Sequence, residues 1–266
     1  MNPSAKRFTI RIALVLILFL VAAYIAYKLM WDPTNQFFGT TLVHGPDDKK
    51  VVALTYDDGP NPPYTDKILD VLKREHVHAT FFVVGRAVEA YPQTVRREVA
   101  LGNAIGNHTW NHPHLVMMTR GEVRRQLQST DEAIYDASGL HTDLMRPPFG
   151  ARDWLVLQTA RKLGYTPVMW SVPLAKDWEY PPAAIIARRI LKYAGDGSIL
   201  VLHDGNRGYL CAKKRINPHI CDRTQDIEAT RIIIDTLKRE GYRFVTIPQL
   251  LAMGKGTMRK PAHGAE

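Results

Sequence analysis

The sequence predicts an α/β fold: an irregular (β/α) barrel with about seven parallel strands, preceded by one N-terminal transmembrane helix. Two patterns predict it. Short apolar runs alternate with segments of helical periodicity through most of the 266 residues, which is typical of a parallel sheet covered by helices. A longer apolar run lies at the N-terminus. Because a closed barrel of this class has eight strand–helix pairs, about seven strands indicate an incomplete one.

The N-terminal run is long enough to cross a membrane. Ile12–Tyr27 is unbroken and apolar, and residues 29–31 extend it to about 20 residues, the length that spans a bilayer core. Three basic residues precede it, Lys6, Arg7 and Arg11, and this charge keeps the N-terminus in the cytoplasm. We expect residues 1–31 to be a cytoplasmic stub and signal anchor of a single-pass cell-membrane protein, with the following domain periplasmic or extracellular. A cleaved signal peptide and a buried soluble helix are the alternatives.

The rest of the chain divides into strands and helices. We predict strands at 51–56, 79–84, 103–107, 143–146, 166–171, 198–203 and 243–247. Helical periodicity lies between them, at Lys67–Lys73, Val123–Ala137, Ala183–Tyr193 and Ile227–Lys238. Thr224 is the candidate N-cap of the last helix and Gly241 its stop. A doubly wound open sheet is the alternative, but no glycine-rich phosphate-binding turn follows any strand.

These elements predict the division of the chain. We expect a connector over 32–49, one folded domain over 50–253 and a basic tail over 254–266. The formal net charge of +9 favours an anionic envelope polymer or anionic lipid headgroups as a neighbour of an exported domain. No basic stripe interleaved with aromatic residues is present, so we expect no nucleic-acid partner, and nothing implies a protein partner.

The chain has two cysteines, Cys211 and Cys221. In an exported domain two cysteines in a polar segment are expected to pair, and a short loop of this kind stabilises the fold by about 2–3 kcal/mol. Two free thiols are the alternative. The cysteines belong to the segment Asn206–Arg223, which either walls a neighbouring site or is a solvated surface loop.

Acidic and imidazole side chains follow the ends of the predicted strands. Asp57 and Asp58 close the first strand before Gly59-Pro60, and His108-Thr109-Trp110-Asn111-His112 follows the third. Two histidines at this spacing share a face if the segment makes a helical turn, and one aspartate completes a three-ligand metal set with room for water. Since chemistry in (β/α) barrels collects at the C-terminal ends of strands, we expect a site here.

Two further motifs follow in the chain, Arg146-Pro147-Pro148-Phe149-Gly150 and Leu200-Val201-Leu202-His203-Asp204. Together with the Asp57 and His108 motifs, and in the same order, they resemble the polysaccharide deacetylases that share the NodB homology domain, carbohydrate esterase family 4. The resemblance covers roughly residues 50–250. It implies the same irregular (β/α) barrel and a metal-dependent hydrolase.

The resemblance implies a role for each motif residue. The metal ligands would be Asp58, His108 and His112, with Zn²⁺ as the expected ion and Co²⁺, Ni²⁺ or Mn²⁺ as alternatives. The catalytic residues would be Asp57 as base, Arg146 as its partner, His203 as general acid and Asp177 as the support of His203. The Asp177-Trp178 motif departs from the family pattern, because relatives often show two aspartates spaced D-x-x-D-W and this loop is one residue longer.

Aromatic side chains in or near the motifs are candidate substrate contacts, since rings stack on the C–H faces of sugars. They are Phe149, Trp178, Tyr64 and Trp110, and packing is the alternative role of each. Many relatives have tyrosine where Phe149 stands; its backbone N–H is the expected oxyanion donor. The other histidines, His114 among them, are expected to have no role in the site.

We therefore predict a hydrolase that removes N-acetyl groups from an N-acetylglucosamine-containing polysaccharide, such as peptidoglycan, a chitin-like chain or an exported polymer. It would cleave carbon–nitrogen bonds other than peptide bonds. An esterase that removes O-acetyl groups from a polysaccharide such as xylan is one alternative. A membrane-tethered glycan-binding module without catalysis is the other.

Overall fold

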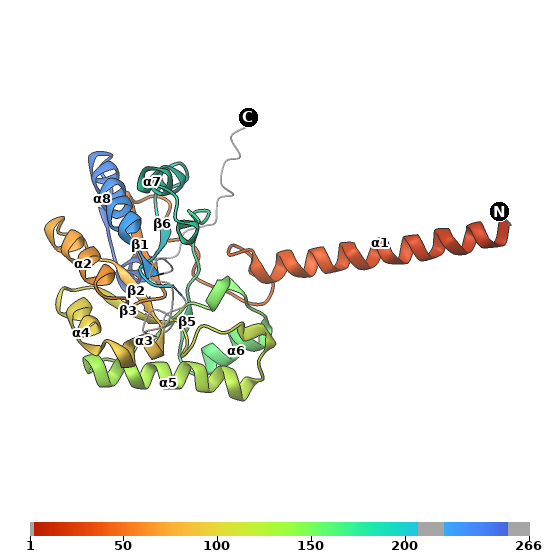
Figure 1. The fold of residues 1–266 in the computed structure, drawn as a ribbon, viewed down its shortest axis with the longest axis horizontal. Helices are drawn as coiled ribbons and strands as arrows, with labels where there is room; N and C mark the ends of the chain where they lie inside the picture. Colours follow the sequence, from red (N-terminus) through yellow and green to blue (C-terminus); the bar gives the residue numbers. More distant parts are fainter. Residues whose placement is uncertain (1–2, 207–220, 255–266) are drawn as a thin grey trace.

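The computed structural model describes residues 3–206 and 221–254, with side chains from residue 10 onward (Figure 1). Its strands are β1 Val51–Asp57, β2 Thr80–Val83, β3 Ala104–Asn107, β4 Leu144–Met145, β5 Thr166–Pro167, β6 Ser198–His203 and β7 Arg243–Phe244. Its α-helices are α1 Pro3–Trp31, α2 Tyr64–Arg74, α3 Gly85–Ala90, α4 Pro92–Ala100, α5 Arg120–Ser138, α6 Trp154–Lys162, α7 Ala183–Leu191, α8 Thr224–Arg239 and α9 Ile247–Ala252. Three 3₁₀ turns lie at η1 Leu115–Met117, η2 Pro148–Gly150 and η3 Asp177–Glu179.

The described strands form one parallel sheet, which confirms the predicted fold class. The order is β5-β4-β3-β2-β1-β6, and β7 pairs with the start of β1. All pairs between these strands are parallel. Every C-terminal strand end therefore lies at the same edge, where a barrel of this class carries its site.

The barrel is irregular because β5 and β6, the two ends of the strand order, are joined by the N-terminal connector. Leu42 forms a parallel bridge with Val168, and His44 forms an antiparallel bridge with Ser198. The Leu42 amide donates to the Pro167 carbonyl at 2.8 Å. The connector thus takes a position that an eighth strand has in a complete barrel.

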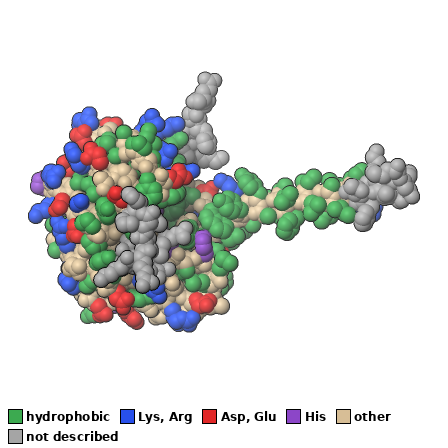
Figure 2. Space-filling view, viewed as in Figure 1, with side chains coloured by type: hydrophobic (Ala, Val, Ile, Leu, Met, Phe, Trp, Pro, Cys, Tyr) green, Lys and Arg blue, Asp and Glu red, His purple; other side chains and the backbone are tan. Residues whose placement is uncertain are grey.

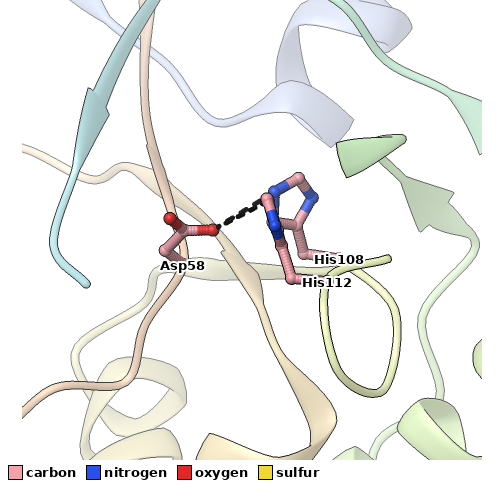
Figure 3. A group of neighbouring side chains, drawn as sticks. All are labelled: Asp58, His108 and His112. Atoms are coloured by element: carbon pink, nitrogen blue, oxygen red, sulfur yellow. Dashed lines mark ion pairs between the residues drawn. The ribbon is translucent and has the colours of Figure 1, made fainter. Parts of the chain in front are cut away.

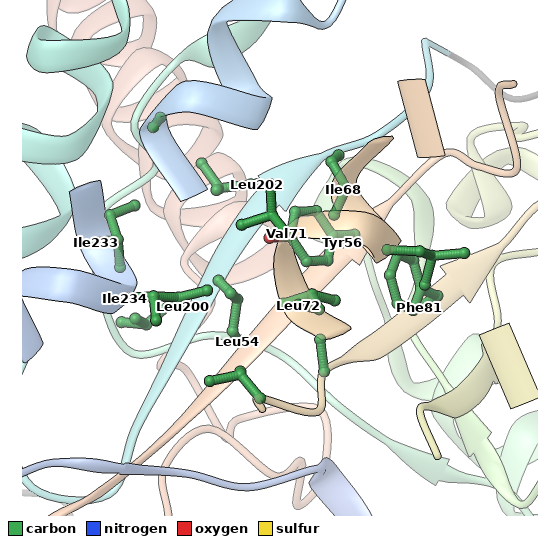
Figure 4. Packing of buried hydrophobic residues seen from close by; sticks show 14 of the residues in the cluster. Leu54, Tyr56, Ile68, Val71, Leu72, Phe81, Leu200, Leu202, Ile233 and Ile234 are labelled. Atoms are coloured by element: carbon green, nitrogen blue, oxygen red, sulfur yellow. The ribbon is translucent and has the colours of Figure 1, made fainter. Parts of the chain in front are cut away.

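Strand alternation divides the core into an outer and an inner layer. On β1 and β6, Leu54, Tyr56, Leu200 and Leu202 face the covering helices and pack against Ile233 of α8 (Figure 4). The alternate residues, such as Val51, Ala53, Ile199 and Val201, form a second buried cluster inside the barrel. Each fully buried aliphatic side chain of this size contributes about 1.5–3 kcal/mol. By the same alternation Asp57 and His203 face the interior at its open end.

Several predicted boundaries were wrong. β4, β5 and β7 have two residues each, shorter than the predicted strands, although backbone hydrogen bonds continue past β5 and β7, from Val168 to Met145 and from Val245 to Val52. The helices α3 and α4, between β2 and β3, were not predicted. Thr224 is the first helical residue of α8, and Arg223 holds the N-cap position. Gly241 follows α8 at φ 85°, as expected of a helix stop.

Helix α1 projects away from the barrel (Figure 1). Its segment Ile10–Trp31 has a mean hydropathy of 2.5 and none of it is buried, so by length and composition it could cross a membrane. Hydrophobic side chains cover its visible surface, in contrast to the mixed surface of the barrel (Figure 2). A helix buried in a soluble core, one of the alternatives, does not fit this exposure.

Candidate active site

A cleft of about 560 Å³ opens at the C-terminal ends of the strands. Its lining includes residues from five of the sequence motifs, among them Asp57, Asp58, His108, His112, Phe149 and His203. Asp57 and His203 are register partners on the adjacent strands β1 and β6. The topology thus brings to one cleft side chains that are widely separated in the sequence.

Asp57 is paired with a fully buried arginine at the base of the cleft. The Arg146 guanidinium donates to Asp57 Oδ1 at 2.6 Å, to Thr55 Oγ1 at 2.9 Å and to the Met169 carbonyl at 3.1 Å. Burial lowers the pKa of Arg146, and the Asp57 carboxylate opposes this shift. The other Asp57 oxygen, Oδ2, lies 4.0 Å from His108 Nε2, so one side of this carboxylate is held and the other faces the histidines.

Asp58, His108 and His112 form a compact cluster (Figure 3). Asp58 Oδ1 lies 3.6 Å from His108 Nε2 and 3.2 Å from His112 Nε2, and one ligand atom from each residue lies within 4.8 Å of the others. His108 Nδ1 faces the Arg146 carbonyl at 2.8 Å. Since a carbonyl only accepts, that nitrogen carries the proton and Nε2 presents its lone pair to the cluster.

The cluster fits a divalent metal ion. A tetrahedral ion with bonds of about 2.0–2.2 Å has ligand atoms about 3.3–3.6 Å apart, close to the separations of Asp58 Oδ1 from the two imidazoles. Burial lowers the pKa of His112 to about 4, although Asp58 opposes this shift. At neutral pH His112 is therefore the neutral imidazole that ligates metals. A mixed nitrogen and oxygen set of this kind suits zinc and other first-row ions.

The two histidines meet through an irregular loop. No described residue of 108–112 is helical, so the helical turn given as the condition for a shared face does not form, and an irregular loop brings the two rings together instead. Asn107 Oδ1 accepts the Thr109 amide at 2.9 Å, and Thr109 Oγ1 accepts the His112 amide at 3.1 Å. Gln126 of α5 accepts the amide of Trp110. Side chains thus bend the loop until both rings face Asp58.

Left-handed backbone conformations gather around the cleft. Among the described residues other than glycine, positive φ occurs at Asp58, His76, Thr109, His112, Phe149, Lys176 and Tyr180. All of these except His76 lie in the segments that form the site. Such conformations cost about 1–3 kcal/mol each and persist where the surrounding structure enforces them. Here they aim Asp58 and His112 into the cleft.

His203 is held by a buried carboxylate. Asp177 accepts the His203 backbone amide at 2.7 Å, and its Oδ1 lies 2.9 Å from His203 Nδ1. Burial lowers the pKa of His203, but Asp177, with smaller contributions from Asp58 and Asp57, raises it to about 9. The same pairing overcomes burial and lowers the pKa of Asp177. At neutral pH this is an imidazolium–carboxylate pair, despite the longer loop that carries Asp177.

The predicted aromatic contacts fall into two groups. Phe149 and Trp178 line the cleft, and the Trp178 ring lies edge-on to His203 with centroids 5.4 Å apart. Tyr64 and Trp110 do not line it. The Tyr64 ring lies beneath the Lys67 ammonium, and Trp110 packs against Gly85, where an added Cβ would lie 2.4 Å from the indole.

Two residues near the cleft were missed from the sequence. The His114 ring stacks on Phe149 with centroids 4.0 Å apart, and Asp226 lies behind Asp177 with no exposed surface. The aromatic pair could have been suspected because His114 is close to the His108 motif. Nothing local marks Asp226, because the fold alone brings α8 to Asp177. Asn206 and Arg223, the two ends of the segment expected either to wall a site or to be a solvated loop, line the cleft. Cys211 lies outside the described residues, so its pairing with Cys221 stays a prediction.

The chain is similar to known deacetylases. A family model described as polysaccharide deacetylase matches residues 44–168. The peptidoglycan-N-acetylglucosamine deacetylase PgdA of Listeria monocytogenes is 37% identical over 76% of this chain, which spans only 39% of that relative. A chitooligosaccharide deacetylase of a Bradyrhizobium species is 38% identical, with 75% of this chain and 90% of the relative covered.

A solved structure agrees with the sequence matches. The Bc1960 peptidoglycan N-acetylglucosamine deacetylase, in complex with a hydroxamate-type N-oxidanyl benzamide, superposes with a TM-score of 0.71. The two chains are 34% identical, and the match covers 81% of this chain and 94% of that one. Fold, order of motifs and near full-length relatives agree, and the chain belongs to the polysaccharide deacetylase family.

Proposed function

We propose that this protein is a metal-dependent N-deacetylase of an N-acetylglucosamine-containing polysaccharide, with peptidoglycan as the first candidate. One observation carries the proposal: Asp57 and His203 are register partners on adjacent strands, next to the three residues that could hold a metal ion. Asp57 is paired with Arg146, and His203 with Asp177. Hydrolysis of an amide needs a base for water and an acid for the leaving amine. The cleft offers both.

Asp57 is the proposed base. Arg146 holds its Oδ1 at 2.6 Å, which leaves Oδ2 to accept a proton from water at the cluster. The ligand role falls to Asp58, His108 and His112. When bound there, a divalent ion would lower the pKa of water and polarise the acetyl carbonyl; we propose Zn²⁺, with Co²⁺, Ni²⁺ and Mn²⁺ as alternatives.

His203 is the proposed general acid. Its pKa of about 9 keeps it protonated at neutral pH, so it can give a proton to the departing amine nitrogen. Asp177 fixes the ring by accepting from both the backbone and the side chain of His203. The Phe149 N–H is the proposed donor to the oxyanion.

Substrate binding is assigned to the cleft rim. Trp178 is 38% exposed and Phe149 36% exposed, which leaves ring surface for a sugar. The relatives named for peptidoglycan and for chitooligosaccharide support a β-linked N-acetylglucosamine chain as the substrate class. Because these relatives are named for substrates that carry N-acetyl groups, we propose amide hydrolysis rather than ester hydrolysis.

The test is release of acetate by the purified full chain in detergent. Chitooligosaccharide and peptidoglycan should both be assayed, with and without a chelator, and with acetylated xylan as the ester substrate. Asp57→Asn should lower kcat by about 10²–10⁴, whereas Asp48→Asn, at an exposed position, should have no effect. Release that is unchanged by chelation or by Asp57→Asn would refute the proposed chemistry. Faster release from xylan would favour the esterase.

Membrane attachment through α1 is the second part of the proposal. Arg152 joins the end of α1 to the barrel: its guanidinium donates to the carbonyls of Asp32 at 2.7 Å and Asn35 at 2.6 Å, and its amide to Met30 at 3.3 Å. We propose that α1 is an uncleaved anchor, that the catalytic domain is extracytoplasmic and that this domain begins near residue 41, where the connector enters the sheet, and ends near 253.

Attachment is tested by cell fractionation and by the mass of the isolated protein. The full mass in the membrane fraction, with the barrel accessible to protease added outside the cytoplasmic membrane, is the expected result. A mature protein that lacks residues 1–26 would instead show a cleaved signal peptide. This outcome would leave the deacetylase proposal intact.

A further inference from the structure

A second buried carboxyl group lies behind Asp177. Asp226, in the first turn of α8, has no exposed surface, and neither of its side-chain oxygens has a hydrogen-bond donor among the described residues. Its carboxyl group lies against that of Asp177, close enough for the two to share a hydrogen bond. Among the described residues, the cation paired with Asp226 is Arg223, whose Nη1 lies 3.9 Å from Asp226 Oδ2, beyond hydrogen-bond distance.

Two adjacent buried carboxyl groups cannot both be ionised without a large cost. Asp177 already accepts from the His203 amide and faces His203 Nδ1, so it is the anion of the pair. Asp226 has no donor among the described residues, and a proton on one of its oxygens would give that oxygen a partner and Asp177 a further donor. Burial and the Asp177 charge also raise the pKa of Asp226 well above its ordinary value.

We propose that Asp226 is a protonated positioning residue that donates a hydrogen bond to Asp177 and so holds the Asp177 carboxylate against His203. The line of contacts is then carboxylic acid, carboxylate, imidazolium. This inference rests on the proposed role of His203 as general acid. It assigns the first turn of α8 a part in the site.

The charged and titratable groups around Asp226 come from each neighbouring element. They are Asp177 of η3, His203 of β6, Tyr56 of β1 and Arg223 before α8. Arg223 and the N-terminal end of α8 favour an ionised Asp226, whereas Asp177 and burial favour the neutral acid. Since no N–H of the helix donates to Asp226, the helix end does not supply the contact that would stabilise the anion.

Asp226→Asn is the decisive variant, because an amide replaces a neutral donor with a neutral donor of the same shape. For a protonated Asp226, the alkaline limb of kcat/KM and the NMR titration of labelled His203 should both stay at the wild-type pKa in the full chain. An ionised Asp226 would raise the pKa of His203, so loss of its charge in Asp226→Asn would lower the pKa of His203 by about one unit or more. That result would overturn the proposal.

Asp226→Leu removes the donor without adding a charge. We expect kcat to fall about 10-fold with KM unchanged, because Asp177 loses the contact that orients it, and Asp226→Thr, which restores a hydroxyl donor, should recover most of the loss. A leucine variant as active as wild type would contradict the positioning role. If leucine prevents folding, the asparagine and threonine variants still decide.

One measurement is independent of activity. The infrared difference spectrum, wild type minus Asp226→Asn at neutral pH, should contain the carbonyl band of a protonated carboxyl group. The difference is needed because burial also raises the pKa of Glu98 and of Asp204, and their bands cancel between the two proteins. A wild type that releases no acetate would refute the deacetylase function but not this band. A difference spectrum without this band would refute the protonated acid even in an active enzyme.

Discussion

Two buried arginines that are close in the sequence have opposite surroundings. Arg146, inside the cleft, meets a carboxylate at 2.6 Å as well as backbone carbonyls. Within the described part of the chain, the guanidinium of Arg152, at the junction between α1 and the barrel, donates to carbonyls alone, those of Asp32, Pro33, Asn35 and Gly150. Burial lowers the pKa of Arg152 to about 10, with Asp32 opposing the shift.

The different partners of the two arginines indicate different roles, one in the cleft and one in the stability of the fold. The Arg146 charge acts on Asp57, a group that faces the cluster of Asp58, His108 and His112. The Arg152 charge is solvated by the peptide groups that follow α1 and by Gly150, which adjoins the cleft residue Phe149. Arg146 therefore orients the Asp57 carboxylate, whereas Arg152 connects the end of α1, the connector and Gly150. Substitution of each should affect a different observable.

The largest effect is expected from Arg146→Met. It leaves Asp57 buried without its cation, so we expect kcat/KM for chitooligosaccharide to fall about 10²–10⁴-fold and the free energy of unfolding to fall by about 3–5 kcal/mol. Arg146→Lys keeps the charge but not the forked donors, and should be intermediate in activity. Comparable activity in Arg146→Met and wild type would remove the reason to assign Arg146 to the site.

Arg152→Met should mainly affect stability. Four carbonyls lose a charged donor, and we expect the free energy of unfolding to fall by about 2–4 kcal/mol, measured by urea denaturation in detergent. The kcat per folded molecule should stay within about threefold of wild type. A drop in kcat as large as that of Arg146→Met would show that the junction controls the cleft through Gly150.

The protonation of His203 gives the next effect. With a pKa of about 9, kcat/KM should be level through neutral pH and fall above about pH 9 as the acid loses its proton. Asp177→Asn removes the charge that raises this pKa, so the alkaline limb should move toward 6.5, the unperturbed value, and activity at pH 7.5 should fall about 10–100-fold. His141, exposed and 2.7 Å from Asp131, offers the control Asp131→Asn, which should leave the profile unchanged.

The same pair makes stability depend on pH. Because the folded-state pKa of His203 lies above its unfolded value, the pair stabilises fully below about pH 6.5 and the contribution is lost as pH rises to about 9. The Tm of the wild type should therefore fall more steeply with rising pH over this window than the Tm of Asp177→Asn. Equal slopes would indicate that the imidazolium is not the folded-state species.

How far the sequence predicts the site depends on the range of the contact involved. Asp57, Asp58 and His203 could be predicted because each ends or follows an apolar strand, and strand ends meet at one edge. Asp177 could be placed only by resemblance, since its loop departs from the family spacing. His112 lies beside Asp58 without the helical turn on which the sequence argument depended: side chains of Asn107, Thr109 and Gln126 bend its loop, and sequence periodicity does not reveal such hydrogen bonds.

The remaining parts depend on contacts between segments far apart in the chain. Leu42 completes the sheet beside Val168 although its surroundings in the sequence have no strand pattern. From the sequence, Arg152 would be expected to be an ordinary surface residue after the Arg146–Gly150 motif, yet it is 1% exposed. Asp226 resembles a favourable acid in the first turn of a helix. Local patterns favour exposure at these positions, and only the packed fold reveals that they are buried.

The smallest effect should come from the exposed tryptophans, which repeat the contrast between cleft and junction. Trp178 lines the cleft beside His203, whereas Trp154 starts α6 next to the Arg152 junction and is 58% exposed. Trp178→Ala should raise KM for a soluble chitooligosaccharide about 2–10-fold with a smaller change in kcat, because the variant loses a ring contact with the sugar that contributes about 0.5–1.5 kcal/mol. Trp154→Ala should leave both constants unchanged. If the two variants raise KM equally, sugar binding extends beyond the cleft to the surface next to α1, and the junction is part of the substrate path.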